Sequence, residues 1–164
     1  MAQAHELRFY EYVNRPYAAV RDALRADLAG ILARATQSAT DRADALAANL
    51  RVELGGIEVG TAVVIEVVEA QEHPRGPLGP VPTTVIKLRW KAARAAAIFP
   101  SMEAELSIYP LSKDETQLDL HGVYRPPLGA LGTVVDAMVG HRIADASVHR
   151  FVSDVATLLK TELA

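Results

Sequence analysis

Apolar and polar residues alternate almost perfectly in three stretches of the chain, residues 84–91, 102–108 and 117–124. This period of two is typical of strands that bury one face. The inward positions that it predicts are Ile86, Leu88, Trp90, Met102, Ala104, Leu106, Ile108, Leu118, Leu120, Gly122 and Tyr124. The opposite face is basic on the first stretch and acidic on the second. We therefore predict antiparallel neighbours with charge pairs between them.

Strand character also appears nearer the N-terminus. Residues 6–14 are rich in aromatic and β-branched side chains, which favour strands. Residues 50–54 and 59–68 alternate on either side of Gly55-Gly56, so we predict a hairpin there. Residues 71–82 contain four prolines and two glycines, which indicates an irregular loop. In total the pattern predicts about six strands.

A period of three to four residues replaces the alternation after the first strand. Its apolar positions are Val20, Leu24, Leu28, Ile31 and Leu32. Pro16 suits the first turn of a helix, where its missing N–H is not needed. We place a break at Gly30 and so predict two short helices, followed by a partly exposed helical connector over residues 36–48.

The longest helix is predicted at the C-terminus, over residues 130–163, with a length of about 50 Å. Its apolar stripe has an early part, Leu131, Val135 and Met138, and a late part, Val148, Val152, Val155 and Leu159. The two parts do not align on one straight helix, so we expect a bend or a rotation of the buried face at residues 140–145. The whole pattern predicts an α+β fold in which a curved antiparallel sheet wraps around this helix.

Composition and charge narrow the classes of function. The 164 residues fit one domain, residues 1–164, and half of them are hydrophobic. A net charge of −3 and dispersed basic residues disfavour nucleic-acid binding. The densest apolar run, residues 62–68, is far shorter than the ~20 residues that cross a bilayer, and the N-terminus lacks signal-peptide features. The sequence has no cysteine for a disulfide or a thiolate site. We expect a cytoplasmic protein without membrane insertion, as a monomer or homodimer.

Several motifs add to the periodic pattern. They are Val13-Asn-Arg-Pro16, Leu88-Arg-Trp90-Lys-Ala92, Ile98-Phe-Pro-Ser-Met-Glu-Ala-Glu-Leu106, Thr116-Gln-Leu118 and Gly122-Val-Tyr-Arg-Pro-Pro-Leu-Gly129. With them the chain resembles the START-like superfamily, also called SRPBCC, which includes the Bet v 1-like proteins and polyketide cyclase/dehydrases. The resemblance is to its small actinobacterial members of unassigned role. It implies a helix-grip fold with a pocket or tunnel between sheet and helix, commonly holding an apolar or aromatic small molecule.

The resemblance does not imply one activity, because the superfamily includes lipid carriers, hormone receptors, aromatase/cyclases and chaperone cofactors. Two departures from larger members bear on the pocket. Six predicted strands, where larger members have seven, indicate a smaller pocket. The helical stretch at residues 37–48 lies where other members often enter a strand directly, so we expect a reshaped or covered mouth.

The predicted ligand-binding residues are those that the pattern turns toward the C-terminal helix, together with residues of that helix. They are Phe9, Glu11, Leu88, Trp90, Phe99, Met102, Leu106, Leu120, Tyr124, Val135, Met138, Arg142 and His149. A mostly apolar wall with few polar groups is typical of small-molecule sites. Aromatic and methionine side chains serve equally well as core filler, so both interpretations stay open.

Few polar groups are placed to do chemistry. Glu11 lies among inward residues, so it is either paired with an arginine or a polar handle inside the pocket. Arg142, Asp145 and His149 share one helix face. They form local ion pairs, or they lie at the end of the cavity, where Asp145 orients His149 against a ligand.

The remaining histidines show no pattern of a metal site. His121 alternates toward the outer face, His73 lies in the proline-rich loop, and His5 precedes the first strand. His141 has no ligand partner three or four residues away. We expect no metal and no cofactor.

Three hypotheses of function follow. The first, which we favour, is a module that binds or transports a hydrophobic or aromatic small molecule in the sheet–helix cavity. The second is an enzyme of the polyketide cyclase/dehydrase type, which needs inward polar groups within reach of one another. The third is a protein-interaction module with a filled core.

Overall fold

The computed structural model describes residues 5–53, 63–75, 79–92, 101–125 and 134–163. Only the backbone is described for residues 38–53, 63–64, 91–92, 101, 125, 134–144 and 147. Five strands and two helices make up this described part. They are β1 (His5–Val13), α1 (Tyr17–Glu53), β2 (Val63–His73), β3 (Thr83–Ala92), β4 (Ser101–Ser112), β5 (Glu115–Arg125) and α2 (Val134–Glu162).

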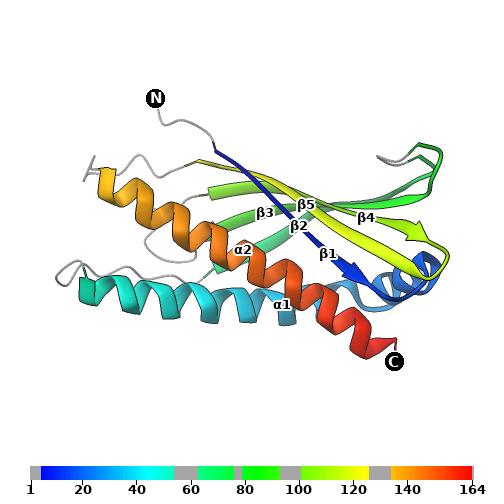
Figure 1. The fold of residues 1–164 in the computed structure, drawn as a ribbon, viewed down its shortest axis with the longest axis horizontal. Coiled ribbons are helices and arrows are strands. Elements are labelled where there is room, and N and C mark those ends of the chain that lie inside the picture. Colours follow the sequence, from blue (N-terminus) through cyan, green and yellow to red (C-terminus); the bar gives the residue numbers. More distant parts are fainter. Residues whose placement is uncertain (1–4, 54–62, 76–78, 93–100, 126–133, 164) are drawn as a thin grey trace.

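The strands form one curved antiparallel sheet in the order β1-β5-β4-β3-β2. Both helices cover the same face of this sheet, and they lie side by side in opposite directions (Figure 1). The other face is open to solvent. This arrangement confirms the predicted α+β class, with a curved antiparallel sheet around a C-terminal helix.

The inner face of the sheet is buried as the alternation predicted. Its most deeply buried side chains are Ile86, Leu88, Trp90, Leu106, Ile108, Leu118, Leu120 and Tyr124. On α2 the predicted late stripe is buried, together with Phe151 and Ala156. Removal of this apolar surface from water is the main favourable term in the stability of the fold.

The number of strands differs from the prediction. Residues 50–53, predicted as a strand, are the last residues of α1, so five strands are described where six were predicted. The alternation there spans few residues and follows a run of strong helix formers, and such short apolar runs do not distinguish strand from helix. Gly55-Gly56 lies outside the described residues.

Two strands are longer than predicted. β2 starts at Val63 and continues to His73, so the predicted loop at residues 71–82 begins three residues later. β4 continues to Ser112, where a turn was predicted from Tyr109. In both cases pairing with a neighbouring strand extends regular structure into residues whose own types favour a turn.

α1 contains the predicted break, but at Asp27 and not at Gly30. Asp27 has non-helical backbone angles, φ −149° and ψ 52°, and its carboxylate accepts a hydrogen bond of 3.0 Å from the N–H of Gly30. An aspartate that accepts from the third residue after it is an N-cap. The first helical segment is therefore short, whereas the second is long and includes the predicted connector.

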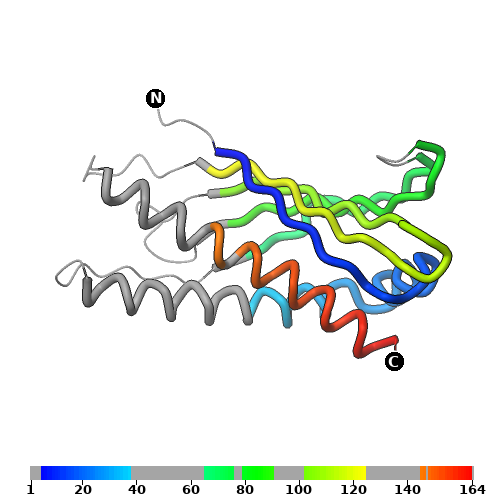
Figure 2. Tube along the Cα trace, viewed as in Figure 1, coloured from blue at the N-terminus to red at the C-terminus, as the bar shows by residue number. Residues whose placement is uncertain are grey.

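α2 continues without interruption through residues 140–145, where a bend or rotation was predicted. Figure 2 follows β1 and the described half of α2 along one side of the molecule, where the two elements contact each other. Within the described part of the chain, no helix is both long enough and apolar enough to cross a membrane.

The outer face carries the predicted charge pairs. Lys87 on β3 lies opposite Glu105 on β4, and Arg89 lies opposite Glu103. Lys87 also forms an ion pair of 3.0 Å with Glu69 on β2. His121 is exposed on this face, as predicted, with its Nε2 3.9 Å from a carboxylate oxygen of Glu6. Exposed pairs of this kind set register more than they add stability.

Candidate functional site

One row of inward residues crosses all five strands near the start of β1. It consists of His5, Tyr124, Met102, Trp90 and Ile65, each directly opposite the next on the neighbouring strand. We call it the Tyr124 row. Its three central side chains are buried, whereas Ile65 is half-buried and His5 is exposed. The exposure of the side chains in this row therefore increases from the centre of the sheet toward both of its edges.

Aromatic contacts tie this row to α2. The Trp90 ring meets the Phe151 ring edge-on, with centroids 5.1 Å apart and planes at 79°. Edge-to-face pairs of this kind are favourable beyond the area that they bury. Both rings are almost fully buried, so the contact joins the middle of α2 to the centre of the sheet.

Met102 lies over the small residue next to it in the sheet. A Cβ atom at Gly122 would be 2.7 Å from the Met102 Sδ and 3.4 Å from the Cβ of Ala104. Only glycine at position 122 leaves room for the thioether in this position. The space above Gly122 and Ala104 is therefore filled by one flexible, polarizable side chain.

Tyr124 is the polar group of the row. Burial raises the pKa of its phenol above the ordinary value of 10.0, and the negative charge of Asp145 on α2 raises it further. The His5 ring stacks on the Tyr124 ring, with centroids 5.1 Å apart and planes at 19°. Asp145 is half-buried. A phenol, a carboxylate and an imidazole thus gather at this end of the sheet–helix interface.

The opposite end of the interface is fastened by polar contacts. The hydroxyl of Tyr17 on α1 is 2.7 Å from the Oγ1 of Thr84 on β3, and both groups are buried. Arg25 on α1 donates 2.6 Å from Nε to Glu72 at the end of β2. The Arg15 guanidinium donates to the backbone oxygen of Leu163, just after α2. These contacts join the helices and the sheet at the end opposite the Tyr124 row.

Solved structures share this architecture over almost the whole chain. The Zhui aromatase/cyclase from a Streptomyces species superposes with a TM-score of 0.54 at 14% identity, over 99% of this chain and 97% of its own. A protein from Thermus thermophilus superposes with a TM-score of 0.51 at 16% identity, over 96% of this chain and 99% of its own. This chain has the START-like fold. No protein-family model and no curated protein matches the sequence. At such identities the likeness concerns the START-like fold and not the activity.

The sequence-predicted site residues fall into three groups. The first group is buried on the inner face of the sheet and consists of Leu88, Trp90, Met102, Leu106, Leu120 and Tyr124. The structure brings these together as one continuous wall.

The side chains of a third group lie outside the description. Phe99 is not among the described residues, and only the backbone of Val135, Met138 and Arg142 in α2 is described.

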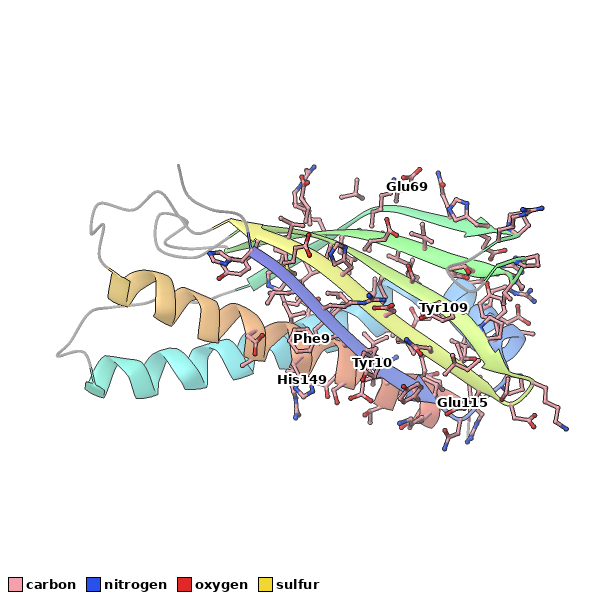
Figure 3. The ribbon with its side chains drawn as sticks, turned by 45° about the horizontal axis from the view of Figure 1, so that its top comes forward. Phe9, Tyr10, Glu69, Tyr109, Glu115 and His149 are labelled. Carbon is pink, nitrogen blue, oxygen red and sulfur yellow. The ribbon has the colours of Figure 1, made fainter. Side chains whose placement is uncertain are left out.

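The second group lies at the margin between β1 and α2. Phe9 and Glu11 are half-buried on the inner side of β1, as predicted. The rings of Phe9 and His149 lie 5.5 Å apart, and His149 itself is exposed (Figure 3). Among the described side chains, no arginine pairs with Glu11. Arg8 is instead bound to Asp119, and Arg15 to backbone oxygens.

The structure separates two residues that the sequence analysis combined. No hydrogen bond or ion pair joins Asp145 to His149 among the described contacts. Asp145 acts on Tyr124 of β5, whereas His149 contacts Phe9 of β1. The two groups thus face different rows of the sheet.

Sequence reasoning missed three residues of the site. His5 belongs to β1 and does not precede it, and its parity with Leu7 and Phe9 would have placed it inward. Phe151 and Ile65 also complete the aromatic and apolar wall, but their partners are decided by packing between elements. A search of the described residues finds no cluster of three or more acidic or histidine side chains that would hold a metal ion.

Proposed function

We propose that this protein binds or transports a hydrophobic or aromatic small molecule between the sheet and α2, as one domain over residues 1–164. The ligand lies against the Tyr124 row, with its apolar part toward Trp90 and Met102. Its polar group points to Tyr124 and Asp145. The observation that carries the proposal is the Tyr124 row itself, where an apolar inner face ends in a small polar group. Small-molecule sites combine these two features.

We place the ligand at the Tyr124 end of the sheet–helix interface because the other end is closed by polar contacts. The Tyr17–Thr84 and Arg25–Glu72 contacts fasten the other end, and the residues between the two ends are fully buried. Met102 supplies the adaptable part of the wall, because a thioether chain changes rotamer at little cost. Movement of Met102 away from Gly122 makes room for a flat ring between Trp90 and Tyr124.

A filled-core interaction module is the second candidate. The edge-on contact of Trp90 with Phe151 and the position of Met102 over Gly122 favour it, since both fill the interior. The cyclase-like enzyme has less support among the described residues. Its polar groups are divided between the Tyr124 row and the Phe9–His149 margin, and catalysis needs them within hydrogen-bond reach of one reacting group.

Native mass spectrometry of freshly purified protein is the test of occupancy. We expect the native mass to exceed the denatured mass by that of a releasable apolar compound. Delipidated protein should then take up the same compound again. A native mass equal to the denatured mass, with no uptake of apolar or aromatic compounds, would establish the filled-core module instead.

A matched pair of tyrosine variants tests the proposed orientation of the ligand, with its polar group toward Tyr124. Tyr124→Phe should weaken binding of the released compound about three- to tenfold, because the ligand loses one hydrogen bond. Tyr109→Phe is the control, since Tyr109 is also buried but lies on the outer face of the same sheet. Equal affinities in the two variants would contradict the place proposed for the polar group.

A further inference from the structure

β1 is an edge strand that pairs on one side only. Its nine residues pair with β5 in a continuous register, and among the described strands no other pairs with it. It has no proline, no lysine and no bulge. These are among the features that prevent an edge strand from pairing with another chain; an inward-pointing charge is another, and β1 has one at Glu11.

The exposed charges of β1 do not protect the edge either, because both lean back over β5. The Arg8 guanidinium donates to both carboxylate oxygens of Asp119, at 3.1 and 2.6 Å, and this carboxylate is only 8% exposed. The hydroxyl of Tyr109 lies 3.5 Å from the same carboxylate. The carboxylate of Glu6 turns to His121. The charges of β1 on this face are thus engaged within the sheet.

The other edge of the sheet is protected in the expected manner. β2 has a register shift between Val67 and Glu69, and it carries Glu66, Glu69 and Glu72. The bulge opposes pairing with a second copy, whereas Glu69 and Glu72 pair within the molecule, with Lys87 and Arg25. The two edges therefore differ, and β1 is the less protected one.

β1 also presents the most exposed aromatic side chains of the outer face. Tyr10 is 58% exposed and Tyr12 is 40% exposed, and their rings meet edge-on at 5.8 Å. Figure 3 shows Phe9 and Tyr10 on neighbouring positions of this strand. Tyrosine is enriched in protein interfaces, since it buries a large rigid surface at a low cost in conformational entropy.

We propose that β1 pairs antiparallel with β1 of a second copy, with Phe9 opposite Phe9 on the two-fold axis. Directly opposed residues point to the same face of a sheet. The outer faces of the two copies therefore lie on the same side only when the numbers of two opposed residues add up to an even number. The sum of 18 pairs all nine residues. It places Arg8 opposite Tyr10 and Glu6 opposite Tyr12, without like charges directly opposed. The sum of 16 places Arg8 opposite Arg8. The sum of 14 pairs Glu6 with Arg8 but shortens the ladder.

This pairing accounts for the half-burial of Phe9, which the partner's copy of the same ring would cover. It also places Arg8 of each copy opposite a tyrosine and not opposite a like charge. A second copy thus suits β1 in three respects: its free backbone edge can pair, its aromatic side chains can be covered, and no like charges oppose each other.

The first test compares two lysine variants by sedimentation velocity over a range of concentrations. Tyr10→Lys places a cation opposite Arg8 of the second copy, twice per dimer, and should weaken the dimer about tenfold. Tyr12→Lys is the matched control, because its cation faces Glu6 and should leave the dimer as tight or tighter. Both changes are on exposed positions, and circular dichroism verifies the fold. A wild-type monomer at every concentration overturns the proposal, as does a dimer that Tyr10→Lys leaves intact or that both variants weaken equally.

A covalent test measures the register directly. The chain has no cysteine, so Phe9→Cys introduces a single thiol. Directly opposed residues of an antiparallel pair have Cα atoms about 4.5–5.5 Å apart, within the range of a disulfide. We expect a covalent dimer after mild oxidation, and none for Val68→Cys at the exposed, bulged edge of β2. Absence of the Phe9→Cys dimer, or equal amounts from both variants, overturns the register.

Discussion

Position 122 shows how one residue decides the shape of the interior. Gly122 lies in the middle of β5, where glycine has no side chain to pack and weakens a strand. Its neighbour Met102 uses the space, because the thioether sulfur lies only 2.7 Å from where a Cβ atom of residue 122 would be. The glycine and the methionine therefore act as a pair, and the effect of a substitution at one position on stability should depend on the residue at the other.

A double-mutant cycle tests this pair. Gly122→Ala should lower the free energy of unfolding by about 1–3 kcal/mol, because the new methyl group overlaps Met102. In a Met102→Ala background the same change should cost much less, since the overlap is removed. Urea unfolding gives both values. Equal costs in the two backgrounds would show that Met102 does not occupy the space above residue 122.

At the scale of elements, the break in α1 has a clear cause in its sequence. Asp27 caps the second helical segment through the N–H of Gly30. A Cβ atom at Gly30 would lie 2.4 Å from the Asp27 Oδ1, so glycine is required while the cap is present. The cap turns the chain from the end of the sheet, where Tyr17 is fastened to Thr84, onto the path beside α2.

The cap is tested by substitution of Asp27. Asp27→Ala should lower the free energy of unfolding by about 1 kcal/mol, because the N–H of Gly30 loses its acceptor. Asp27→Asn keeps an acceptor oxygen and should stay within a few tenths of a kcal/mol of the wild type. Urea unfolding of the two variants separates the cap from the charge. A similar loss in both would assign the effect to the ion pair between Asp27 and Arg34 instead.

At the scale of the whole molecule, the sheet separates two different surfaces. The inner face is mostly apolar; its polar groups lie around Tyr124, at the Tyr17–Thr84 contact and at Glu11. The outer face has paired charges over β2, β3 and β4, and an aromatic region on β1 next to the Arg8–Asp119 pair. The proposed ligand lies on the inner face, and the proposed self-association uses the edge at β1, including Phe9 of the inner side.

The buried tyrosines of both faces make the stability of the molecule depend on alkaline pH. Burial raises the pKa of Tyr109, and the charge of Asp119 raises it further; burial and Asp145 do the same for Tyr124. A group with a raised pKa in the folded state binds its proton more tightly there than in the unfolded chain. Its stabilising contribution is complete below the unfolded pKa of about 10 and is lost as the pH rises through the folded value.

The prediction is a fall in the free energy of unfolding above about pH 10, which urea unfolding at successive pH values would measure. Tyr109→Phe should make this fall less steep, because it removes one of the two tyrosines whose pKa is raised in the folded state. Tyr10→Phe, at an exposed position of the same face, is the control and should leave the slope unchanged. A slope that Tyr109→Phe does not alter would contradict the assignment.

Local pattern was enough for much of this protein. Alternation identified the inward residues of β3, β4 and β5, and the charge rows identified β3 and β4 as neighbours. The helical period located α1 and the buried late stripe of α2. Each of these features depends on residues within a few positions of one another, because side-chain direction repeats every two residues in a strand and about every 3.6 in a helix.

Only the tertiary structure decided the rest. Residues 50–53 are helical although their alternation indicated a strand, and His5 joins β1 because β5 provides a partner for it. The meeting of Trp90 with Phe151, and of Tyr124 with Asp145, joins segments far apart in the chain. Such contacts arise from packing between elements, which a periodic pattern within one element does not specify. For the same reason the sequence predicted a sheet wrapped around a helix, whereas the tertiary structure decided where along it the polar end of the interior lies.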